Sequence, residues 1–251
     1  MARSILVTGG TGTLGSLVVR HLLDAGSDVR VLSRHALPGE GYAPVAVDLR
    51  DGAGLDTAVE GAHTIIHCAT TLRGGDIESA RNLIEAAKRA GVEHLVYISI
   101  VGIDRLPLGY YRTKLAVERL IENSGLRWTI LRTTQFHDLV ARFCRAQARL
   151  PVLLIPAGIS VQPIHTDEVA ARLAELGTGE PAWRVPDWGG PEVRGLDELA
   201  RAYLRSAGRR RPVLRIRLPG KVSRGYREGR HLTPERAVGK ITFDEFLAGT
   251  H

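Results

Sequence analysis

The sequence predicts an α/β fold with a doubly wound parallel sheet, and three observations support this prediction. Short β-branched apolar runs alternate with longer amphipathic segments over the first two-thirds of the 251 residues. Apolar runs such as residues 64–66 are continuous, as in strands that helices cover on both faces of a sheet. A glycine-rich turn directly follows the first apolar run, at residues 9–15.

The individual elements follow from these patterns in chain order. Six strands are predicted before residue 134: Ser4–Thr8, Asp28–Ser33, Pro44–Asp48, Thr64–Cys68, His94–Ser99 and Trp128–Arg132. Helices are predicted where apolar residues recur with helical spacing and a glycine follows: Leu14, Val18 and Leu22 before Gly26, Ala80, Leu83, Ile84 and Ala87 before Gly91, and Val117, Leu120 and Ile121 before Gly125.

The alternation changes after residue 133. A helix is predicted over residues 134–148, then an apolar run at 151–156, then a helix over Thr166–Leu176 with Thr166 as its N-cap. Later elements are shorter and richer in Pro, Gly and Arg, and neither a repeat nor a linker separates the two parts. We therefore expect one unit over residues 1–251, with a core at 1–133 and a small sub-region at 134–251.

The composition excludes several classes of protein. The chain is 44% apolar and 24% charged, which is ordinary for a globular protein, and no apolar run approaches the length of a membrane-spanning helix. The first residues lack the features of a signal peptide. Cys68 and Cys144 match no metal-binding or disulfide spacing. We expect a cytoplasmic protein with two thiols in its core, no membrane partner and no bound metal.

Positive charge is concentrated near the C-terminal end. Residues 201–251 hold 13 Arg or Lys against 4 Asp or Glu, within a net charge of +7. The run Arg209-Arg210-Arg211 has no interleaved aromatic residues on which bases could stack. We interpret it as a solvated surface, so no nucleic-acid partner is expected. A monomer or a homodimer is expected.

The glycine-rich turn has the pattern of a phosphate-binding loop. In Thr8-Gly9-Gly10-Thr11-Gly12-Thr13-Leu14-Gly15 the glycines follow the spacing G-x-x-G-x-x-G between a strand and a helix. Gly9 permits the tight turn, Gly12 lets backbone N–H groups approach a pyrophosphate, and Gly15 lets the helix and the sheet pack closely. The helix start adds unpaired N–H donors. The loop predicts a Rossmann-type dinucleotide site; the alternative is a turn without a ligand.

The end of the second predicted strand indicates which dinucleotide binds. An NAD site places Asp or Glu there to accept a hydrogen bond from the ribose 2′-OH, whereas this chain has Ser33-Arg34. The Arg34 guanidinium offers a planar pair of donors to a 2′-phosphate, and Ser33 can donate as well. This pattern favours NADP(H), unless Arg34 is an ordinary exposed residue at a strand end.

Motifs along nearly the whole chain are shared with one family. They are the glycine loop at residues 8–15, Val47-Asp48-Leu49, residues 80–87, residues 91–99, Tyr110-Tyr111-Arg112-Thr113-Lys114, residues 131–136, residues 161–165 and residues 242–247. In these motifs the chain resembles the atypical short-chain dehydrogenase/reductases, in particular the NmrA-like, NAD(P)H-binding branch. The resemblance implies a Rossmann-type fold in which residues 134–251 mostly bind the substrate.

The resemblance also implies roles for residues outside the glycine loop. Asp48 and Leu49 would flank the adenine, and Cys68-Ala69-Thr70 would pass near the nicotinamide ribose and the pyrophosphate. Residues 133–136 would lie beside the nicotinamide and the substrate. Without the resemblance, Asp48 is interpreted as a turn residue and Phe136 as part of the core.

Tyr110 and Lys114 are the candidate catalytic pair. Four residues apart on a predicted helix, their side chains share one face. A neighbouring ammonium lowers the pKa of a phenol, so that Tyr110 can pass a proton to or from a substrate oxygen. The family resemblance adds that Lys114 would hydrogen-bond the nicotinamide ribose. The alternative is a packed aromatic residue and a surface lysine.

Ser99 is the candidate for a third catalytic group. It ends the fifth predicted strand, but extended members of the superfamily carry the working hydroxyl two residues later, where this chain has Val101. Asn82 does not match the position of the Asn that classical members use. Ser99 is therefore either a catalytic hydroxyl or the end of a strand.

The candidate substrate site is mostly apolar. Its predicted residues are Val101, Tyr111, Thr134, Gln135, Phe136 and His137, and segments 101–111, 134–140 and 183–188 would shape it. Leu106, Leu108 and Leu139 indicate a hydrophobic substrate. His137 is either a substitute acid or an exposed or satisfied helix residue. His165 either closes the floor of the pocket or is structural.

Two functions from different classes follow from the sequence. The first is an NADPH-dependent oxidoreductase that reduces a carbonyl, quinone or enone of a hydrophobic small molecule, with Tyr110 as proton donor. The alternative is an NADP(H)-sensing regulatory protein that binds the dinucleotide without turnover. Val101 in place of a hydroxyl favours the sensor, and the intact Tyr110 and Lys114 favour the reductase.

Overall fold

The computed structural model of the chain describes residues 4–35, 39–71 and 74–249. The chain forms two compact units, each built from three stretches of sequence. The first unit comprises Met1–Ser99, Arg112–Leu131 and Asp167–Val185, and the second comprises Ile100–Tyr111, Arg132–Thr166 and Pro186–His251. Residues 167–185 of the predicted C-terminal sub-region thus belong to the first unit.

The central sheet has seven strands in the order β3-β2-β1-β4-β5-β6-β9. The strands are β1 (Ser4–Thr8), β2 (Asp28–Ser33), β3 (Tyr42–Ala46), β4 (Thr64–His67), β5 (His94–Ile100), β6 (Trp128–Thr133) and β9 (Trp183–Arg184). Val7 on β1 pairs in parallel with Val31 on β2 and with Ile66 on β4. Because the strand order reverses between β1 and β4, their carboxyl ends form the switch point where such sheets bind ligands. The predicted doubly wound parallel sheet is confirmed.

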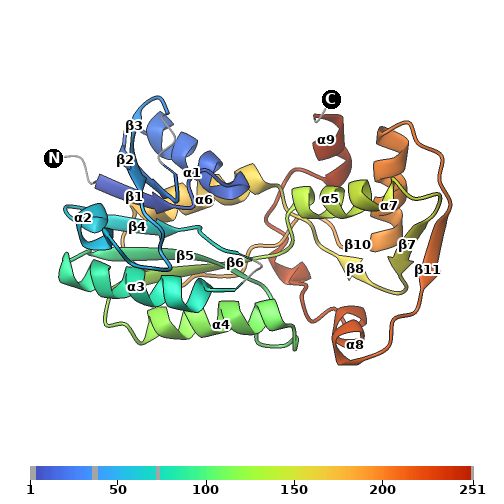
Figure 1. Cartoon of the computed structure of the whole chain (residues 1–251). Coiled ribbons are helices and arrows are strands. Elements are labelled where there is room, and N and C mark those ends of the chain that lie inside the picture. Colours follow the sequence, from blue (N-terminus) through green and yellow to red (C-terminus); the bar gives the residue numbers. More distant parts are fainter. Residues whose placement is uncertain (1–3, 36–38, 72–73, 250–251) are drawn as a thin grey trace. The chain divides into compact units, whose positions relative to one another are not determined.

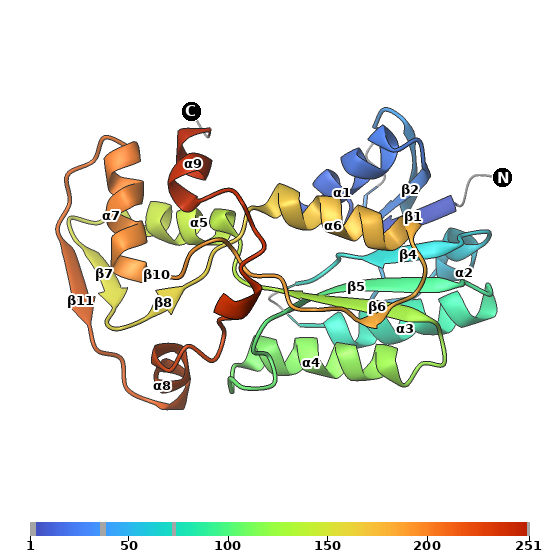
Figure 2. The same cartoon turned by 180° about the vertical axis from the view of Figure 1, so that it is seen from behind.

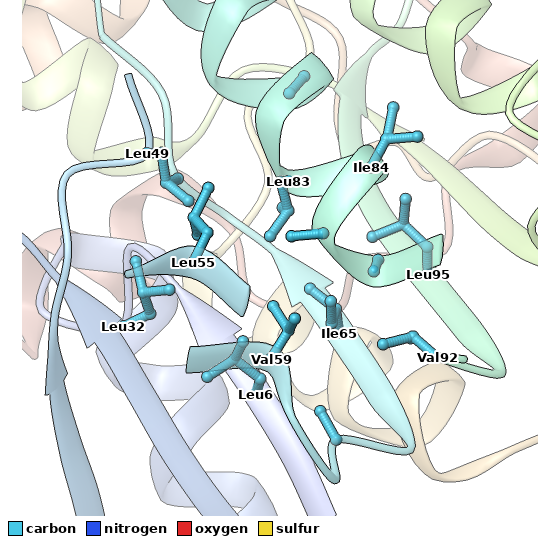
Figure 3. Close-up of a cluster of buried hydrophobic side chains, with 14 of the residues drawn as sticks. Leu6, Leu32, Leu49, Leu55, Val59, Ile65, Leu83, Ile84, Val92 and Leu95 are labelled. Carbon is cyan, nitrogen blue, oxygen red and sulfur yellow. The ribbon is translucent and has the colours of Figure 1, made fainter. Parts of the chain in front are cut away.

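Helices cover both faces of this sheet. Figure 1 shows α1 (Thr13–Asp24) and α6 (Thr166–Thr178) on one face, and α3 (Asp76–Arg89) and α4 (Gly109–Glu122) on the other. Residues of β1, β2, β4 and β5 pack against α3 and the short helix α2 (Leu55–Val59) in a continuous apolar cluster (Figure 3). Helices on both faces explain the continuous apolar strands.

Several predicted elements differ from the structure at their ends, and two of these differences involve candidate site residues. The third strand covers Tyr42–Ala46 instead of Pro44–Asp48, so Asp48 lies in the following turn, where its Oδ1 accepts from the Arg50 N–H at 2.9 Å. The helix predicted from residue 134 begins at His137. Residues 134–136 are extended because the Thr134 N–H donates to the Trp188 carbonyl and Phe136 forms a bridge with Ile164.

The second unit contains small sheets and short helices. Its elements are α5 (His137–Gln147), β7 (Leu153–Pro156), β8 (Ser160–Val161), β10 (Arg194–Gly195), α7 (Leu196–Ser206), β11 (Val213–Ile216), α8 (Lys221–Arg227), the 3-10 helix at Pro234–Arg236 and α9 (Phe243–Ala248). Figure 2 shows α7 beside β7 and β11, which pair in parallel. Cys144 is fully buried in the core of this unit, as expected, whereas Cys68 in the first unit is only half-buried.

No helix in the described ranges is both long enough and apolar enough to cross a membrane. Among the same residues, no three side chains of the metal-binding types come together as a group.

Candidate active site

The glycine loop makes a tight turn against the backbone that follows β4. Gly9 has a left-handed φ of +69°, and its carbonyl accepts from the Gly12 N–H at 2.9 Å. A Cβ on Gly9 would lie 2.8 Å from the backbone of Ala69, closer than a real side chain can approach. The turn therefore requires glycine at this position for both its conformation and its packing.

The structure corrects the role predicted for Gly15. A Cβ there would lie 2.2 Å from the Gly9 carbonyl oxygen, so Gly15 brings the start of α1 against the turn instead of against the sheet. Gly10 is the glycine that permits close approach to the sheet, because its Cβ would lie 2.7 Å from the Val31 side chain. The spacing rule did not single out Gly10.

The loop fits a pyrophosphate. The Gly12 N–H is used within the turn, so donors for a phosphate come from the next three residues, Thr13, Leu14 and Gly15. Their N–H groups precede the first intrahelical hydrogen bond of α1, where the helix dipole also favours an anion.

The candidate adenosine residues lie after β2 and β3. Arg34 is exposed, whereas the Ser33 hydroxyl donates to the His35 carbonyl at 2.5 Å. The Arg34 guanidinium is therefore the more available donor for a 2′-phosphate. Leu49 is buried, and the Asn82 amide holds the loop beyond it by donating to the Leu49 carbonyl at 3.1 Å. Asn82 thus has a structural role that the sequence did not reveal.

The segment after β4 is held at both ends. The Thr8 hydroxyl lies 2.7 Å from Nδ1 of the buried His67 and 3.4 Å from the Ala69 N–H. Beyond it, the Thr70 hydroxyl donates to Asp76 Oδ2 at 2.6 Å. The predicted cofactor segment Cys68-Ala69-Thr70 is thus anchored to β1 and to the first residue of α3. His67 and Asp76 were not predicted, although a histidine in an apolar strand is an unusual local signal.

Lys114 is a buried residue, so the interpretation as a surface lysine is wrong. It is 3% exposed, and its Nζ donates to the Ile98 carbonyl at 2.8 Å. Burial lowers the pKa of Lys114 to about 8, although the negative charges of Asp76 and Glu118 oppose this shift. The ammonium form therefore persists at neutral pH.

The two adjacent tyrosines of α4 differ in their surroundings. Tyr110 is half-buried and precedes Lys114 by one helical turn, so the two side chains share a helix face. Tyr111 is 5% exposed and accepts a hydrogen bond from the Tyr226 hydroxyl at 3.3 Å. Burial raises the pKa of Tyr111 far above its usual value, which makes it a weaker proton donor than an ordinary tyrosine. Of the pair, Tyr110 is the more accessible.

Ser99 and Val101 occupy different environments. The Ser99 side chain is 1% exposed, and its Oγ has no hydrogen-bond partner among the described residues. A buried hydroxyl without a partner marks a place where a ligand or a water completes the hydrogen bonding. Val101 is fully buried, and its N–H donates to the Thr133 carbonyl at 3.0 Å.

The candidate substrate residues of the second unit are mostly fixed by backbone contacts. The Thr134 hydroxyl accepts from the Gly190 N–H at 3.1 Å. The buried Gln135 amide is near enough to lower the pKa of Tyr111 slightly, without forming a hydrogen bond of ordinary geometry to it. Phe136 is half-buried at the start of α5.

His137 is enclosed by the C-terminal segment. It is fully buried, its Nε2 lies 2.9 Å from the Ile241 carbonyl, and the rings of Phe243 and Phe246 pack around it. Burial lowers the pKa of His137 to about 4, so the ring is neutral near pH 7. Its Nδ1 is buried without a partner among the described residues, so His137 is neither exposed nor fully satisfied. We interpret it as a structural helix residue with one hydrogen bond and not as a substitute acid.

Acid is expected to destabilise the fold through its buried histidines. Burial lowers the pKa values of His94, His137 and His231 from 6.5 to about 4. Below pH 6.5 the unfolded chain therefore binds protons that the folded chain does not, and the free energy of unfolding falls as the pH drops towards 4. Denaturant unfolding between pH 4 and 7 measures this slope. His137→Gln should reduce it, and an unchanged slope in that variant would contradict the assignment.

Residues 183–188, which were predicted to shape the pocket, lie partly at the amino end and partly at the carboxyl end of β6. Trp183 is 60% exposed, pairs with Thr129 near the amino end of β6, and packs edge-on against Trp128. The carboxyl ends of the strands carry the site in this class of sheet, so Trp183 is wrongly assigned to the pocket. Trp188 instead bridges Thr133 at the carboxyl end of β6.

The two predicted sets of residues fall in different units. All candidate cofactor residues, together with Ser99 and Lys114, belong to the first unit. Tyr110 and all candidate substrate residues belong to the second. The fold and the glycine loop thus define a Rossmann-type nucleotide-binding α/β protein.

Comparisons with known proteins identify the family. A model of the NAD(P)H-binding family matches residues 9–150. The NAD(P)H azoreductase of Xenophilus azovorans is 31% identical over 216 residues, which cover 82% of this chain and 74% of that protein. Quinone oxidoreductase 2 of Escherichia coli is 26% identical over 214 residues, which cover 82% of this chain and 75% of that protein. The chain belongs to the NAD(P)H-binding family.

Solved structures support the same fold. The NADPH-dependent quinone oxidoreductase of Escherichia coli in complex with NADPH superposes with a TM-score of 0.85 at 22% identity, covering 98% of this chain and 99% of that chain. The triphenylmethane reductase of Citrobacter sp. in complex with NADP(H) gives a TM-score of 0.81 at 20% identity, covering 99% and 100%. These two structures confirm the fold that the family resemblance implied. The match to the NAD(P)H-binding family supports the binding of a nicotinamide dinucleotide.

Proposed function

We propose that this chain is an NADPH-dependent oxidoreductase that reduces a carbonyl, quinone or enone group of a hydrophobic small molecule. The observation that carries the proposal is the buried ammonium of Lys114, one helical turn after the half-buried Tyr110 on α4. A regulatory protein that only binds the dinucleotide does not need a proton donor with a cation beside it. The relatives named as quinone oxidoreductase and azoreductase support the same class of reaction.

Each residue of the proposed site has one task. When bound, NADPH supplies a hydride to the acceptor. Tyr110 gives its phenolic proton to the substrate oxygen, and the positive charge of Lys114 stabilises the phenolate that remains. Ser99, in the first unit, has a buried Oγ without a partner among the described residues, and this hydroxyl is free to donate to a ligand. The loop at residues 9–15 holds the pyrophosphate, while Asp48, Leu49 and the segment 68–70 border the rest of the cofactor.

The proposal is tested by measuring oxidation of NADPH in the presence of candidate acceptors. The panel consists of quinones, aromatic ketones and enones, with azo and triphenylmethane dyes added because of the relatives' activities. We expect turnover with at least one aromatic acceptor. Tight NADPH binding without turnover on any acceptor would favour the alternative function, a sensor of NADP(H).

Arg34 is expected to set the preference for NADPH over NADH. One bidentate, charge-assisted contact to the 2′-phosphate contributes about 1.4 kcal/mol or more, which corresponds to about tenfold tighter binding. Arg34→Ala should therefore bring the two dissociation constants, measured by fluorescence titration, close together. Arg50→Ala is the matched control, because it removes another exposed arginine of the first unit. An unchanged preference in Arg34→Ala would exclude Arg34 from this role.

A further inference from the structure

The buried ammonium of Lys114 lies against the face of an aromatic ring. Its Nζ is 4.2 Å from the centroid of the Tyr97 ring, and it donates to the carbonyl of Ile98, the next residue of β5, at 2.8 Å. Lys114 is 3% exposed and Tyr97 is 1% exposed. Water therefore contributes little to the solvation of this charge, and two consecutive residues of β5 take its place.

The Tyr97 ring attracts Lys114 only when the lysine is charged. Removing an ammonium from water disfavours its charged form, which is the direction in which burial shifts the pKa of Lys114. The negative face of an aromatic ring attracts a cation, and the attraction grows when water is excluded. A neutral amine gains almost nothing from the same contact.

Other groups around Lys114 carry charge or can titrate. The negative charges of Asp76 on α3 and Glu118 on α4 act to keep the lysine protonated. Burial raises the pKa of the Cys68 thiol after β4 to about 12, so this group is neutral at the pH where Lys114 titrates. His67 on β4 stacks on Tyr97, with ring centroids 5.4 Å apart and an angle of 22° between the planes. Burial, assisted by the charge of Lys114, lowers the pKa of His67 to about 3. The histidine is therefore neutral and adds no repulsion at neutral pH.

The same histidine connects the ring to the cofactor loop. The Thr8 hydroxyl lies 2.7 Å from His67 Nδ1, and Thr8 directly precedes Gly9. The Thr8 hydroxyl oxygen also accepts from the Ala69 N–H, with the nitrogen 3.4 Å away. His67 and Tyr97 thus form a stacked pair of rings. His67 is held by Thr8 at the end of β1, and Tyr97 contacts the ammonium of Lys114.

We propose that Tyr97 is a positioning residue for Lys114, whose ring holds the buried lysine side chain in place and keeps it protonated. The consequence for catalysis rests on the proposed function, because it requires that Lys114 assist Tyr110. The hold on the lysine itself does not depend on turnover. Sequence patterns gave no sign of it, since Tyr97 lies within an apolar strand and matches no catalytic motif.

The direct test measures the pKa of Lys114 in the whole protein. Lysine labelled with carbon-13 at Cε gives four NMR signals, from Lys88, Lys114, Lys221 and Lys240, and Lys114→Met identifies the buried one by its absence. Tyr97→Phe keeps the ring and should leave the pKa of Lys114 near its wild-type value. Tyr97→Met fills a similar volume without a ring and should lower that pKa by about one unit, a tenfold loss of proton affinity.

A second measurement needs no substitution at Tyr97, in case Tyr97→Met does not fold. Atoms above the face of an aromatic ring are shifted upfield by its ring current, so the Hε protons of Lys114 should resonate upfield of those of the other lysines. A Lys114 signal at the usual position would overturn the proposal. Equal Lys114 pKa values in folded Tyr97→Met and Tyr97→Phe would also overturn it.

The pH dependence of turnover separates this proposal from the proposed function. If both hold, the alkaline limb of kcat/KM moves to lower pH in Tyr97→Met and returns in Tyr97→Phe. Suppose that the pKa of Lys114 is lower in Tyr97→Met than in the wild type, but the wild-type protein oxidises no NADPH. That result would support the role of Tyr97 and refute the proposed reductase activity. A shifted pKa with an unmoved alkaline limb would refute the part of the proposal in which the charge of Lys114 controls catalysis.

Discussion

Tyr110→Phe is expected to lower kcat/KM by about 10²- to 10⁴-fold, the usual contribution of a general acid. The substitution keeps the ring and its packing on α4 but removes the only proton that the side chain can donate. NADPH binding should survive, because the loop at residues 9–15 and Arg34 are untouched. Steady-state rates with the best acceptor, combined with fluorescence titration of NADPH, measure the two effects separately.

The matched control for this prediction is Tyr203→Phe. Tyr203 lies on α7, is half-buried against the core of the second unit, and loses the same hydroxyl. It should keep wild-type kcat/KM. If Tyr110→Phe also keeps wild-type turnover, hydride transfer in this protein proceeds without a fixed acid, and Tyr110 is not the proton donor.

Lys114→Met is expected to reduce both turnover and NADPH affinity, because Lys114 would serve Tyr110 and the ribose at the same time. Methionine retains most of the buried volume, so a general loss of packing is avoided. Equilibrium titration of NADPH and the rate at saturating NADPH distinguish the two contributions. A variant that loses turnover alone would show that Lys114 does not contact the cofactor.

Local patterns in the sequence were sufficient for the sheet and for the glycine loop. The periodicity of strands and helices can be recognised from consecutive residues. A turn with a φ of +69°, as at Gly9, favours glycine whatever residues surround it. The glycine spacing therefore predicts the turn at Gly9, but it did not predict that Gly15 packs against the Gly9 carbonyl. The role of Gly10 was missed because its partner, Val31, comes from the next strand of the sheet.

The environment of the candidate site residues could not be predicted, because it depends on contacts between residues that are far apart in the sequence. Lys114 meets Ile98 and Tyr97 across the interface between α4 and β5, so the Tyr-x-x-x-Lys motif could not distinguish a buried lysine from an exposed one. The same holds for Asp76, whose partner Thr70 follows a different strand. Trp183 was misplaced for the converse reason: its neighbours in sequence reach the carboxyl edge of the sheet, but β9 pairs with the amino end of β6.

Gly15→Ala is expected to destabilise the protein and weaken NADPH binding, although alanine favours helices. In a helix, replacing glycine by alanine ordinarily stabilises by about 1 kcal/mol. Here the added Cβ would lie 2.2 Å from the Gly9 carbonyl oxygen and 2.8 Å from the Gly10 Cα, and backbone atoms cannot rotate aside. Relieving this contact costs about 1–3 kcal/mol and separates the start of α1 from the turn.

The same displacement removes the phosphate donors from their positions. Each charge-assisted hydrogen bond that is lost costs about 1.5–3 kcal/mol, so NADPH affinity should fall by about tenfold or more for each N–H group displaced. Gly109→Ala is the control, because Gly109 is also in the first turn of a helix and a Cβ there meets no atom within 4 Å. Its thermal unfolding should match wild type or improve slightly. If Gly15→Ala behaved like Gly109→Ala in both unfolding and NADPH titration, the close contact between α1 and the turn would not be what shapes the phosphate site.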